Sequence, residues 1–356
     1  MKISILAILF LGVSAQAQEA TISLQDSISG SYKQSMENYI QLRLDVNSDI
    51  TEFKFNNPSP AKDFHVLPNE SYQSRISVGY KWLNFSYSFS PKIDGFNDDE
   101  ALKGKSDIFG LSLNLSFKEL QQSFFYKKVI GYYLSNSNDY RSELNASGIF
   151  SKYAILPEFK STEAGFVNYY YFNAKKFSSQ FARNQSEIQL KSAGSLVSVL
   201  GFYYTDIDGR KQKLPFLQSY IDQNLIYPAR NQTFYGVIGT GYAYNYIFSK
   251  HFYATGFLYP SVGAQFSKVA FPVEKPSEKH TEMTISGYSE FSLGYNSDTW
   301  FGGIYGNYNG YTSPTSEAKS NGEETYAMLF VGYRFKAPKP VEKTFDWLES
   351  KFKKKN

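Results

Sequence analysis

Residues 107–117 read Asp107-Ile108-Phe109-Gly110-Leu111-Ser112-Leu113-Asn114-Leu115-Ser116-Phe117. Large apolar side chains occupy every second position from Phe109 to Phe117, and glycine, serine or asparagine occupies each position between them. Successive side chains of a β-strand point to opposite faces, so this stretch predicts a strand with one apolar and one polar face. The same alternation recurs at 39–47, 71–80 and 82–90.

Eight further segments have strand character, which gives twelve predicted strands in all. Their glycines are unusually frequent for strand interiors, where glycine permits the bends that a curved, closed sheet needs. The predicted strands lie at 39–47, 71–80, 82–90, 107–117, 121–133, 163–172, 192–205, 232–247, 251–267, 283–296, 299–311 and 323–335.

The connections between these strands are alternately short and long. This is typical of bacterial outer-membrane barrels, which have short periplasmic turns and long external loops. The sequence therefore predicts an all-β protein, a transmembrane antiparallel up-and-down β-barrel of about 12 strands. Strands that alternate in direction close into this barrel only if 173–191 is a connection on the periplasmic side. Phe177, Phe181 and Ile188 fall near helical spacing, so we predict a short helix that covers or enters the barrel floor. The alternative is a thirteenth, irregular strand.

The composition favours the same class. Aromatic residues make up 18% of the chain, with 30 Tyr and 31 Phe, and there is no cysteine for a lipid anchor or a disulfide. The mean hydropathy is nevertheless only -0.40. No apolar run of 18 or more residues is present, which excludes a conventional helical membrane protein. The formal net charge of +4 is too small to indicate nucleic acid binding.

The chain ends predict export. Lys2 precedes a short apolar run, and Ala15-Gln16-Ala17 supplies small residues for cleavage, as in a secretory signal peptide. We predict a signal peptide at 1–17, a periplasmic N-terminal segment at 18–38, the barrel at 39–335 and a basic C-terminal tail at 336–356. The predicted location is the outer membrane of a Gram-negative bacterium. The tail predicts a helix at 344–355, which is either a solvated terminus or a contact with the inner leaflet or a partner.

Four charged residues share the polar face of the predicted strands, and we expect them to line the lumen: Arg43, Asp45, Arg75 and Glu290. A charge on the lipid face would cost about 2–4 kcal/mol near the midplane. These residues form either a charged constriction that selects solutes or a set of ion pairs that fills a narrow barrel. Aromatic residues near the short turns, at 169–172, 242–246 and 300–301, predict the inner interfacial girdle, with a sugar-stacking site as the alternative.

Histidine chemistry is limited to His65, His251 and His280, and no serine motif selects one of them. Nucleophile elbows, phosphate-binding loops and clustered zinc ligands are absent from the sequence. We therefore predict a protein that is not an enzyme and that uses no cofactor and no metal. A lipid-modifying barrel enzyme is the third hypothesis for its function.

Three stretches resemble a known family. They are Gly131-Tyr132-Tyr133, then Phe172-Asn173 with Lys176-Phe177-Ser178, and above all Gln189-Leu190-Lys191-Ser192-Ala193-Gly194-Ser195. They are similar to the central signature of domain-of-unknown-function family 4421. The resemblance implies an exported outer-membrane barrel protein of Bacteroidota and no assigned activity. We hypothesise that 173–195 is the working or structure-defining element.

Two functions remain in view besides the enzyme. The first is a passive channel or transporter for small solutes. The second is a structural or partner-binding barrel that acts through its external loops or periplasmic elements. The expected partners are outer-membrane lipid, the barrel-assembly machinery during biogenesis, and small solutes, with no nucleic acid.

Overall fold

The computed structural model describes residues 31–50, 52–55, 63–69, 72–90, 99–212, 229–270, 276–312 and 321–353. The chain divides into two compact units, Met1–Ser31 and Tyr32–Asn356, and every described strand lies in the second. The predicted signal peptide at 1–17 lies outside the described residues.

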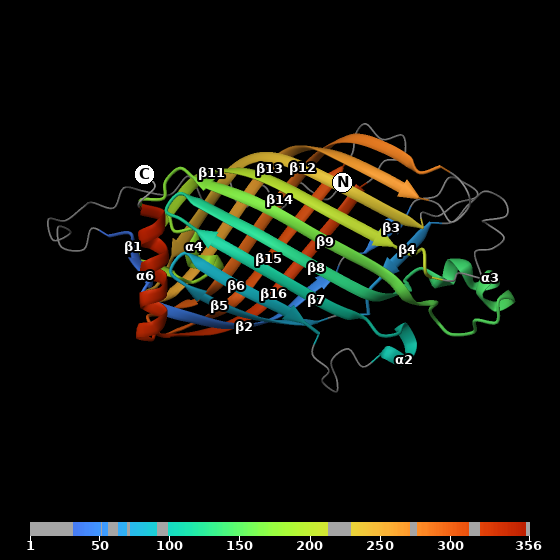
Figure 1. Cartoon of the computed structure of the whole chain (residues 1–356), viewed down its shortest axis with the longest axis horizontal. Coiled ribbons are helices and arrows are strands. Elements are labelled where there is room, and N and C mark those ends of the chain that lie inside the picture. Colours follow the sequence, from blue (N-terminus) through green and yellow to red (C-terminus); the bar gives the residue numbers. More distant parts are fainter. Residues whose placement is uncertain are drawn as a thin grey trace. The chain divides into compact units, whose positions relative to one another are not determined.

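Twelve of the described strands form one closed antiparallel barrel (Figure 1). Each strand pairs with its sequence neighbour in the barrel, β16 pairs with β2, and β8 pairs with β9, so the sheet closes. The predicted fold class is thus confirmed. The strands are β2 Tyr39–Ile50, β5 Gln73–Tyr80, β6 Leu83–Phe89, β7 Asp107–Ser116, β8 Leu120–Leu134, β9 Ile155–Tyr171, β11 Ala193–Asp208, β12 Arg230–Ile247, β13 Phe252–Ala270, β14 Glu278–Asn296, β15 Trp300–Thr312 and β16 Asn321–Lys336.

The start of β9 is the largest difference from the predicted strand boundaries. The strand begins at Ile155 rather than at 163. In its first half the buried residues are Leu156 and Phe159, whereas Lys160 and Thr162 lie toward the outside. In this part of β9 the large apolar side chains Leu156 and Phe159 face inward, whereas in the rest of the barrel such side chains face outward. The search for strands with outward apolar residues therefore missed it.

The two ends of the barrel differ in their connections. We call the end with the turns at 81–82, 117–119, 248–251 and 297–299 the short-turn end, and the opposite end the long-loop end. Figure 1 shows β1, α4 and α6 at the short-turn end and α2, α3, β3 and β4 at the other.

The long-loop end carries a hydrophobic cap. The hairpin of β3 Phe53–Phe55 and β4 Phe64–Leu67 extends the sheet beside β8, and η2 Ser137–Tyr140 and α3 Arg141–Ala146 follow β8. A short helix, α2 Glu100–Lys103, precedes β7. Phe64, Leu144 and Phe159 are each at most 1% exposed and belong to one buried cluster with inward residues of β7, β8, β9 and β11. This cluster packs against the inner side of β7, β8, β9 and β11 at the long-loop end.

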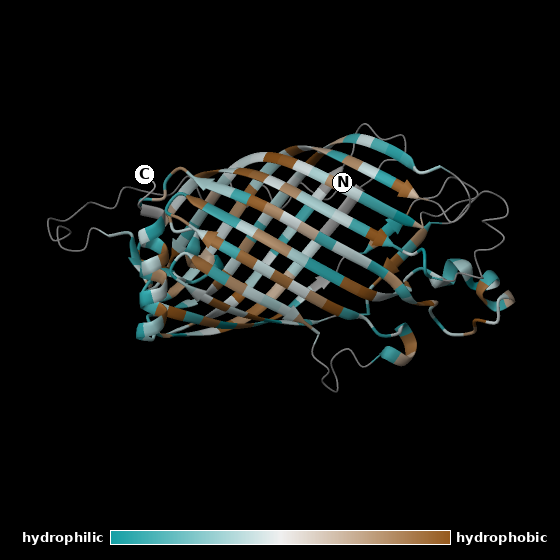
Figure 2. Cartoon of the chain, viewed as in Figure 1, coloured by the Kyte–Doolittle hydropathy of each residue, from teal (hydrophilic) through white to brown (hydrophobic). Residues whose placement is uncertain are grey.

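Hydropathy alternates along the strands, as the bands of Figure 2 show, and the exposed apolar side chains give the barrel an apolar outer face. On β2, Leu42 and Leu44 are 45% and 49% exposed, whereas Asp45 is fully buried. Apolar residues of the other barrel strands are exposed in the same way. The outer face is therefore built for an apolar surrounding and the inner face for packing and hydrogen bonds.

Among the described residues, no helix has both the length and the hydropathy that crossing a bilayer requires.

The C-terminal helix α6 Lys339–Lys353 packs on the barrel. Phe345 places its ring 4.8 Å from that of Tyr80 and 5.7 Å from that of Trp82, between centroids. Lys81, in the turn between β5 and β6, forms ion pairs with Asp346 and with Glu349 at 2.8 and 3.1 Å. Burial lowers the pKa of Lys81, but hydrogen bonds to these two carboxylates raise it more, so the pKa lies above its ordinary value.

The helix predicted at 344–355 is confirmed, and its contact with the barrel is one that neither alternative for the tail included. The helix starts earlier, with Pro340 in its first turn, where the missing N–H costs nothing. Its apolar residue Phe345 faces the barrel because the turn between β5 and β6 presents two aromatic side chains to it.

Candidate functional site

The connection between β9 and β11, residues 172–192, folds into the short-turn end of the barrel, and we call it the plug. It contains the single helical turn α4 Gln180–Arg183 and the short strand β10 Glu187–Gln189. The predicted short helix is correct. The thirteenth barrel strand is not formed, because β10 pairs with β1 Lys33–Ser35 in a separate two-stranded sheet.

Local chemistry explains the turn of helix. The Ser178 hydroxyl, one residue before the N-cap Ser179, accepts a hydrogen bond from the backbone N–H of Phe181 at 3.1 Å and so satisfies one of the free N–H groups at the start of α4. At the other end Gln185 has a φ of 52°, a left-handed conformation that stops the helix. The chain reverses there, and the Gln185 side chain is completely buried.

Arg183 at the end of α4 joins the plug to one wall of the barrel. Its Nη2 lies 2.7 Å from Oε2 of Glu290 on β14, and both side chains are largely buried. The guanidinium also lies over the rings of Tyr169 and Phe257, at 4.4 and 5.8 Å from the centroids. Arginine suits this position because its planar group can pair with a carboxylate and stack on aromatic rings at once.

Two arginines of the neighbouring strands β2 and β16 bind the plug backbone. Arg43 on β2 donates from Nη1 to the carbonyl oxygen of Arg183 at 2.6 Å. Arg334 on β16, only 2% exposed, donates from Nε to the carbonyl oxygen of Gln185 at 3.0 Å. Arg334 also lies over the ring of Phe301, 4.6 Å from its centroid. These bonds satisfy carbonyl groups that the short helix leaves free.

Amide side chains add two further attachments. Asn184 donates to the hydroxyl of Ser116 on β7 at 2.9 Å, and Asn245 on β12 donates to the carbonyl oxygen of Ser178 at 2.9 Å. The plug is thus bonded to β2, β7, β12, β14 and β16, which lie on different sides of the barrel. It crosses the lumen and closes the short-turn end.

The signature residues fix the exit of the plug into β11. The Gln189 side chain donates to the carbonyl oxygens of Lys176 and Lys191 at 2.7 and 2.8 Å. Its Oε1 accepts the backbone N–H of Ser178 at 2.8 Å. Every polar atom of this buried amide is therefore used, which is what burial of a glutamine requires.

The residues that follow Gln189 join the start of β11 to the plug and to β12 by hydrogen bonds. Ser195 Oγ accepts the backbone N–H of Asn173 at 2.9 Å, and Ser192 Oγ accepts that of Ile247 at 2.9 Å. Ala193 is buried, and the ammonium of Lys191 lies 5.8 Å from the ring centroid of Tyr32. Gly194 lies beneath the Tyr242 ring, whose hydroxyl would be 2.2 Å from an added Cβ.

The structure places two of the four predicted lumen charges, Arg43 and Glu290, in contact with the plug. Arg43 pairs with Asp45, Nε to Oδ1, at 2.8 Å, and Glu290 holds Arg183. Arg75 stands opposite Asp45 on β5, where it donates to Ser88 at 3.0 Å and lies over the Tyr326 ring. Sequence reasoning placed these residues together on a face but could not show that the plug supplies their partners.

Aromatic side chains fill the lumen next to the plug. Tyr169 and Tyr171 point inward and pack with Phe257, Tyr259 and plug residue Phe177. Ring centroids are 6.1 Å apart for Tyr169 and Phe257, and 5.4 Å apart for Tyr171 and Phe177. The prediction of Tyr169, Tyr171 and Phe301 as girdle residues is wrong, because alternation sends only every second ring outward and Phe301 is 2% exposed. Those exposed outside are Tyr170, Phe172, Tyr242, Tyr244, Tyr246 and Trp300.

The three histidines are not brought together. His65 on β4 lies 3.8 Å from a Glu52 carboxylate oxygen, and His280 on β14 lies 3.5 Å from that of Glu278. His251 stacks near Tyr295 in the turn between β12 and β13, at the short-turn end. Within the described ranges, no group of three or more His, Cys, Asp or Glu side chains is arranged to hold a metal ion.

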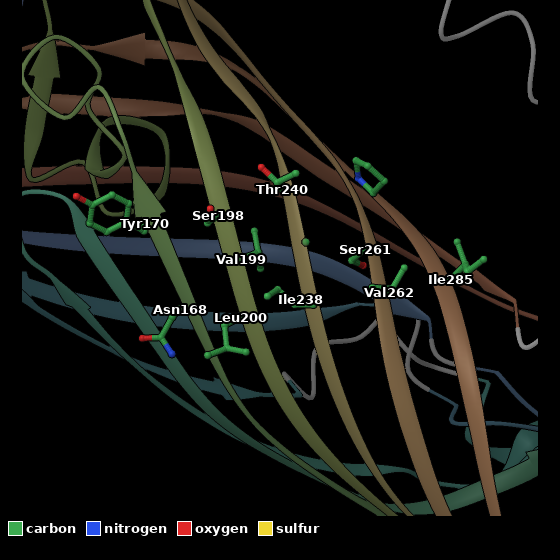
Figure 3. Close-up of a pocket in the computed structure, with 12 residues that line it drawn as sticks. Asn168, Tyr170, Ser198, Val199, Leu200, Ile238, Thr240, Ser261, Val262 and Ile285 are labelled. Atoms are coloured by element: carbon green, nitrogen blue, oxygen red, sulfur yellow. The ribbon is translucent and has the colours of Figure 1, made fainter.

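A groove of about 600 Å³ lies on the outer face of the barrel, across β9, β11, β12, β13 and β14 (Figure 3). The small residues Ser198, Thr240 and Pro260 follow one another across β11, β12 and β13, next to a row of larger residues. That row contains Leu200, Ile238, Val262 and Ile285, which are 41%, 62%, 50% and 53% exposed. The step in side-chain size hollows the surface.

Comparisons with known proteins agree with the predicted resemblance. The family model described as Domain of unknown function (DUF4421) matches residues 25–335. No curated protein matches the chain.

Several solved outer-membrane proteins are similar in structure. The outer membrane protease OmpT from Escherichia coli is 7% identical, with 85% of this chain and 98% of that chain covered and a TM-score of 0.33. OmpT, an outer membrane protein of Vibrio cholerae, is 8% identical, with 83% and 96% covered and a TM-score of 0.31. The beta domain of the Bordetella autotransporter BrkA is 8% identical, with 83% and 98% covered and a TM-score of 0.32.

Proposed function

The chain belongs to the domain-of-unknown-function family 4421, and we propose on that premise that it is an outer-membrane barrel with an occluded lumen. It acts through partners at its two capped ends rather than as a steadily open pore. The description of the family assigns no activity to it, so the proposal is argued from the structure of the barrel.

Membrane location is supported by the sidedness of the wall. Outward positions such as Leu44, Leu196 and Leu329 are apolar and 49%, 58% and 65% exposed, which would be unfavourable in water over so large a surface. Charged groups of β2 and β14 point inward instead. A closed barrel with this sidedness satisfies all of its backbone groups within a bilayer.

Occlusion is the observation that carries the proposal. The plug is hydrogen-bonded across the lumen, through Arg183 to β14 and through Asn184 to β7 on the opposite side of the barrel. Above it lie the inward aromatic rings, and the hydrophobic cap packs inside β7, β8, β9 and β11 at the long-loop end. A solute would have to displace three packed layers, which favours binding functions at the ends over steady diffusion.

A gated solute path is the second candidate, and one observation favours it. On the inner face of β2 and β5, side-chain atoms of Asn47, Gln73 and Ser77 are buried without a hydrogen-bond partner. Buried polar groups are nearly always paired, so these atoms call for water or a polar solute. A path along this polar wall would open only when the plug moves.

Planar-bilayer conductance of the refolded chain separates the two candidates. We expect the wild type to be silent, and steady wild-type openings would contradict an occluded lumen. The double variant Arg183→Ala with Arg334→Ala removes the side-chain bonds of the plug to β14 and β16. If it stays silent while correctly folded, the end-binding function is supported, and if it conducts, the gated path replaces it.

A further inference from the structure

Two lysines stand directly opposite each other on the outer face near the long-loop end. Lys268 on β13 and Lys279 on β14 are cross-strand partners, and both are exposed. Like charges in this position destabilise a sheet. Neither lysine forms an ion pair in the part of the chain that the structure describes.

The carboxylate adjacent in sequence, that of Glu278, does not pair with either lysine. Glu278 is the sequence neighbour of Lys279 but belongs to the other face of the strand, where it lies 3.5 Å from His280. Gln232, the partner of Lys268 on β12, is uncharged. Within the described residues, the lysine pair is therefore an anion-binding arrangement that no carboxylate neutralises.

Other outward cations flank the pair. In the same area Arg230 is held by Asp206 at 2.6 Å and Lys160 by Asp208 at 3.5 Å. These two carboxylates are occupied, so they do not neutralise the lysines. Among the described residues, the two lysines thus present two positive charges without an ion-pair partner, which attract a phosphate group.

The position along the strand indicates what carries the phosphate. Phe266, 51% exposed, is the next outward residue of β13 below Lys268, and it pairs with Phe234 on β12, 45% exposed. Exposed rings of this kind mark the interface of the apolar band. The lysines thus stand just beyond the apolar band, at the level of lipid headgroups.

The outer groove lies below the lysines on the same strands. Val262 at its margin is six residues from Lys268, which is roughly 20 Å along the strand at about 3.3 Å per residue. With a strand tilt of about 45°, this is about 14 Å along the barrel axis, close to half of a hydrocarbon core of about 30 Å. An acyl chain that descends from the lysine pair therefore reaches the groove.

We propose that the outer face of β13 and β14 binds one phosphate-bearing lipid, with its phosphate between Lys268 and Lys279 and an acyl chain in the groove. The inference goes beyond the proposed function and shares with it only the membrane location. An open or a closed lumen leaves it unaffected.

Native mass spectrometry of the full-length protein in detergent tests the phosphate. The probes are lipid A that carries its phosphates and the same lipid A after dephosphorylation. A basic residue near a charged headgroup contributes a factor of about five in affinity, so the pair gives about thirtyfold. We expect the wild type to prefer the phosphorylated probe by about this factor and Lys268→Gln with Lys279→Gln to lose the preference. Equal binding of both probes by the folded wild type would overturn the proposal.

A matched control is Lys105→Gln with Lys152→Gln, which removes two positive charges from the long-loop end outside the site. We expect this control variant to keep the preference for phosphorylated lipid A. If it lost the preference, the positive charge of the long-loop end as a whole would attract the lipid, and the lysine pair would not be a specific site. Inorganic phosphate alone is the second arm. Saturable phosphate binding that needs both lysines, without lipid binding, would overturn the lipid assignment.

The groove has its own test. Ser198→Phe fills it, and Leu196→Phe enlarges an outward residue one row away as its control. We expect Ser198→Phe to weaken binding of the phosphorylated probe and Leu196→Phe to leave it unchanged. Unchanged binding by folded Ser198→Phe would overturn the groove as the site of the chain. Heat-modifiable mobility in gels shows that each variant is folded.

Discussion

At the residue scale, two signature glycines differ in how strictly they are required. Gly131 has a φ of 91° at an irregularity between β8 and β9, and an added Cβ would lie 2.1 Å from the backbone oxygen of Lys105. At Gly194 the crowding atoms belong to Tyr242, whose side chain is half exposed and can move aside. The structure therefore assigns the strict glycine of the signature to position 131.

We predict that Gly131→Ala destabilises the barrel by about 2 kcal/mol, because it adds a positive-φ strain to a clash with backbone. Gly306→Ala is the control, since only the Tyr326 oxygen lies near, at 3.5 Å from the added Cβ. The midpoint of chemical unfolding in detergent measures both. A Gly131→Ala midpoint equal to that of the control would contradict the assignment.

The ion pair of Arg183 with Glu290 allows a second residue-scale test. Glu290→Gln leaves the buried guanidinium without its carboxylate, which should cost about 3 kcal/mol. In the double variant with Arg183→Met no buried charge is left unpaired, so we expect part of the stability to return. Unfolding midpoints of the wild type, the single variants and the double variant provide the cycle, and strict additivity would refute the coupling.

At the element scale, the C-terminal helix is held by a small contact. Phe345→Ala removes its packing on Tyr80 and Trp82, so we expect α6 to leave the barrel and trypsin to cleave it at Lys343 and Lys351 faster. Trp347→Ala serves as the control because that ring is 59% exposed. Limited proteolysis followed over time measures the rates, and equal cleavage in wild type and Phe345→Ala would mean that the helix is solvated already.

The plug is the other element that defines the protein. Its backbone leaves carbonyl groups free at the end of a single helical turn, and arginines of the adjacent strands β2 and β16 bind them. The sequence indicated a connection with helical spacing at Phe177 and Phe181, and both are buried. It could not indicate β10, because three residues that pair with β1 have no period of their own.

At the scale of the whole molecule, the two faces of the wall must meet different surroundings. Leu329 is an outward residue in the middle of β16 and is 65% exposed. Leu329→Arg places a charge in the apolar band, and we expect assembly into lipid vesicles to lose about 2–4 kcal/mol. Thr325→Arg, outward at the long-loop end of the same strand, should cost little.

The fraction of each variant that shows heat-modifiable mobility after refolding into vesicles measures the difference. If Leu329→Arg refolds as completely as Thr325→Arg, the outer face does not meet hydrocarbon. That result would remove the membrane location without any bearing on how the plug is bonded.

The sequence alone determined the twelve strands, their order and the place of the one connection that could not be a barrel strand. The alternation of apolar and polar residues follows from local strand geometry, so the sequence of each strand indicates its two faces, as at Phe109 to Phe117. Only the tertiary structure decided that Tyr169 and Tyr171 fill the lumen, that Arg183 meets Glu290, and that Lys268 stands opposite Lys279. These facts depend on the register of distant strands and on closure of the sheet, which bring together residues that no local pattern connects.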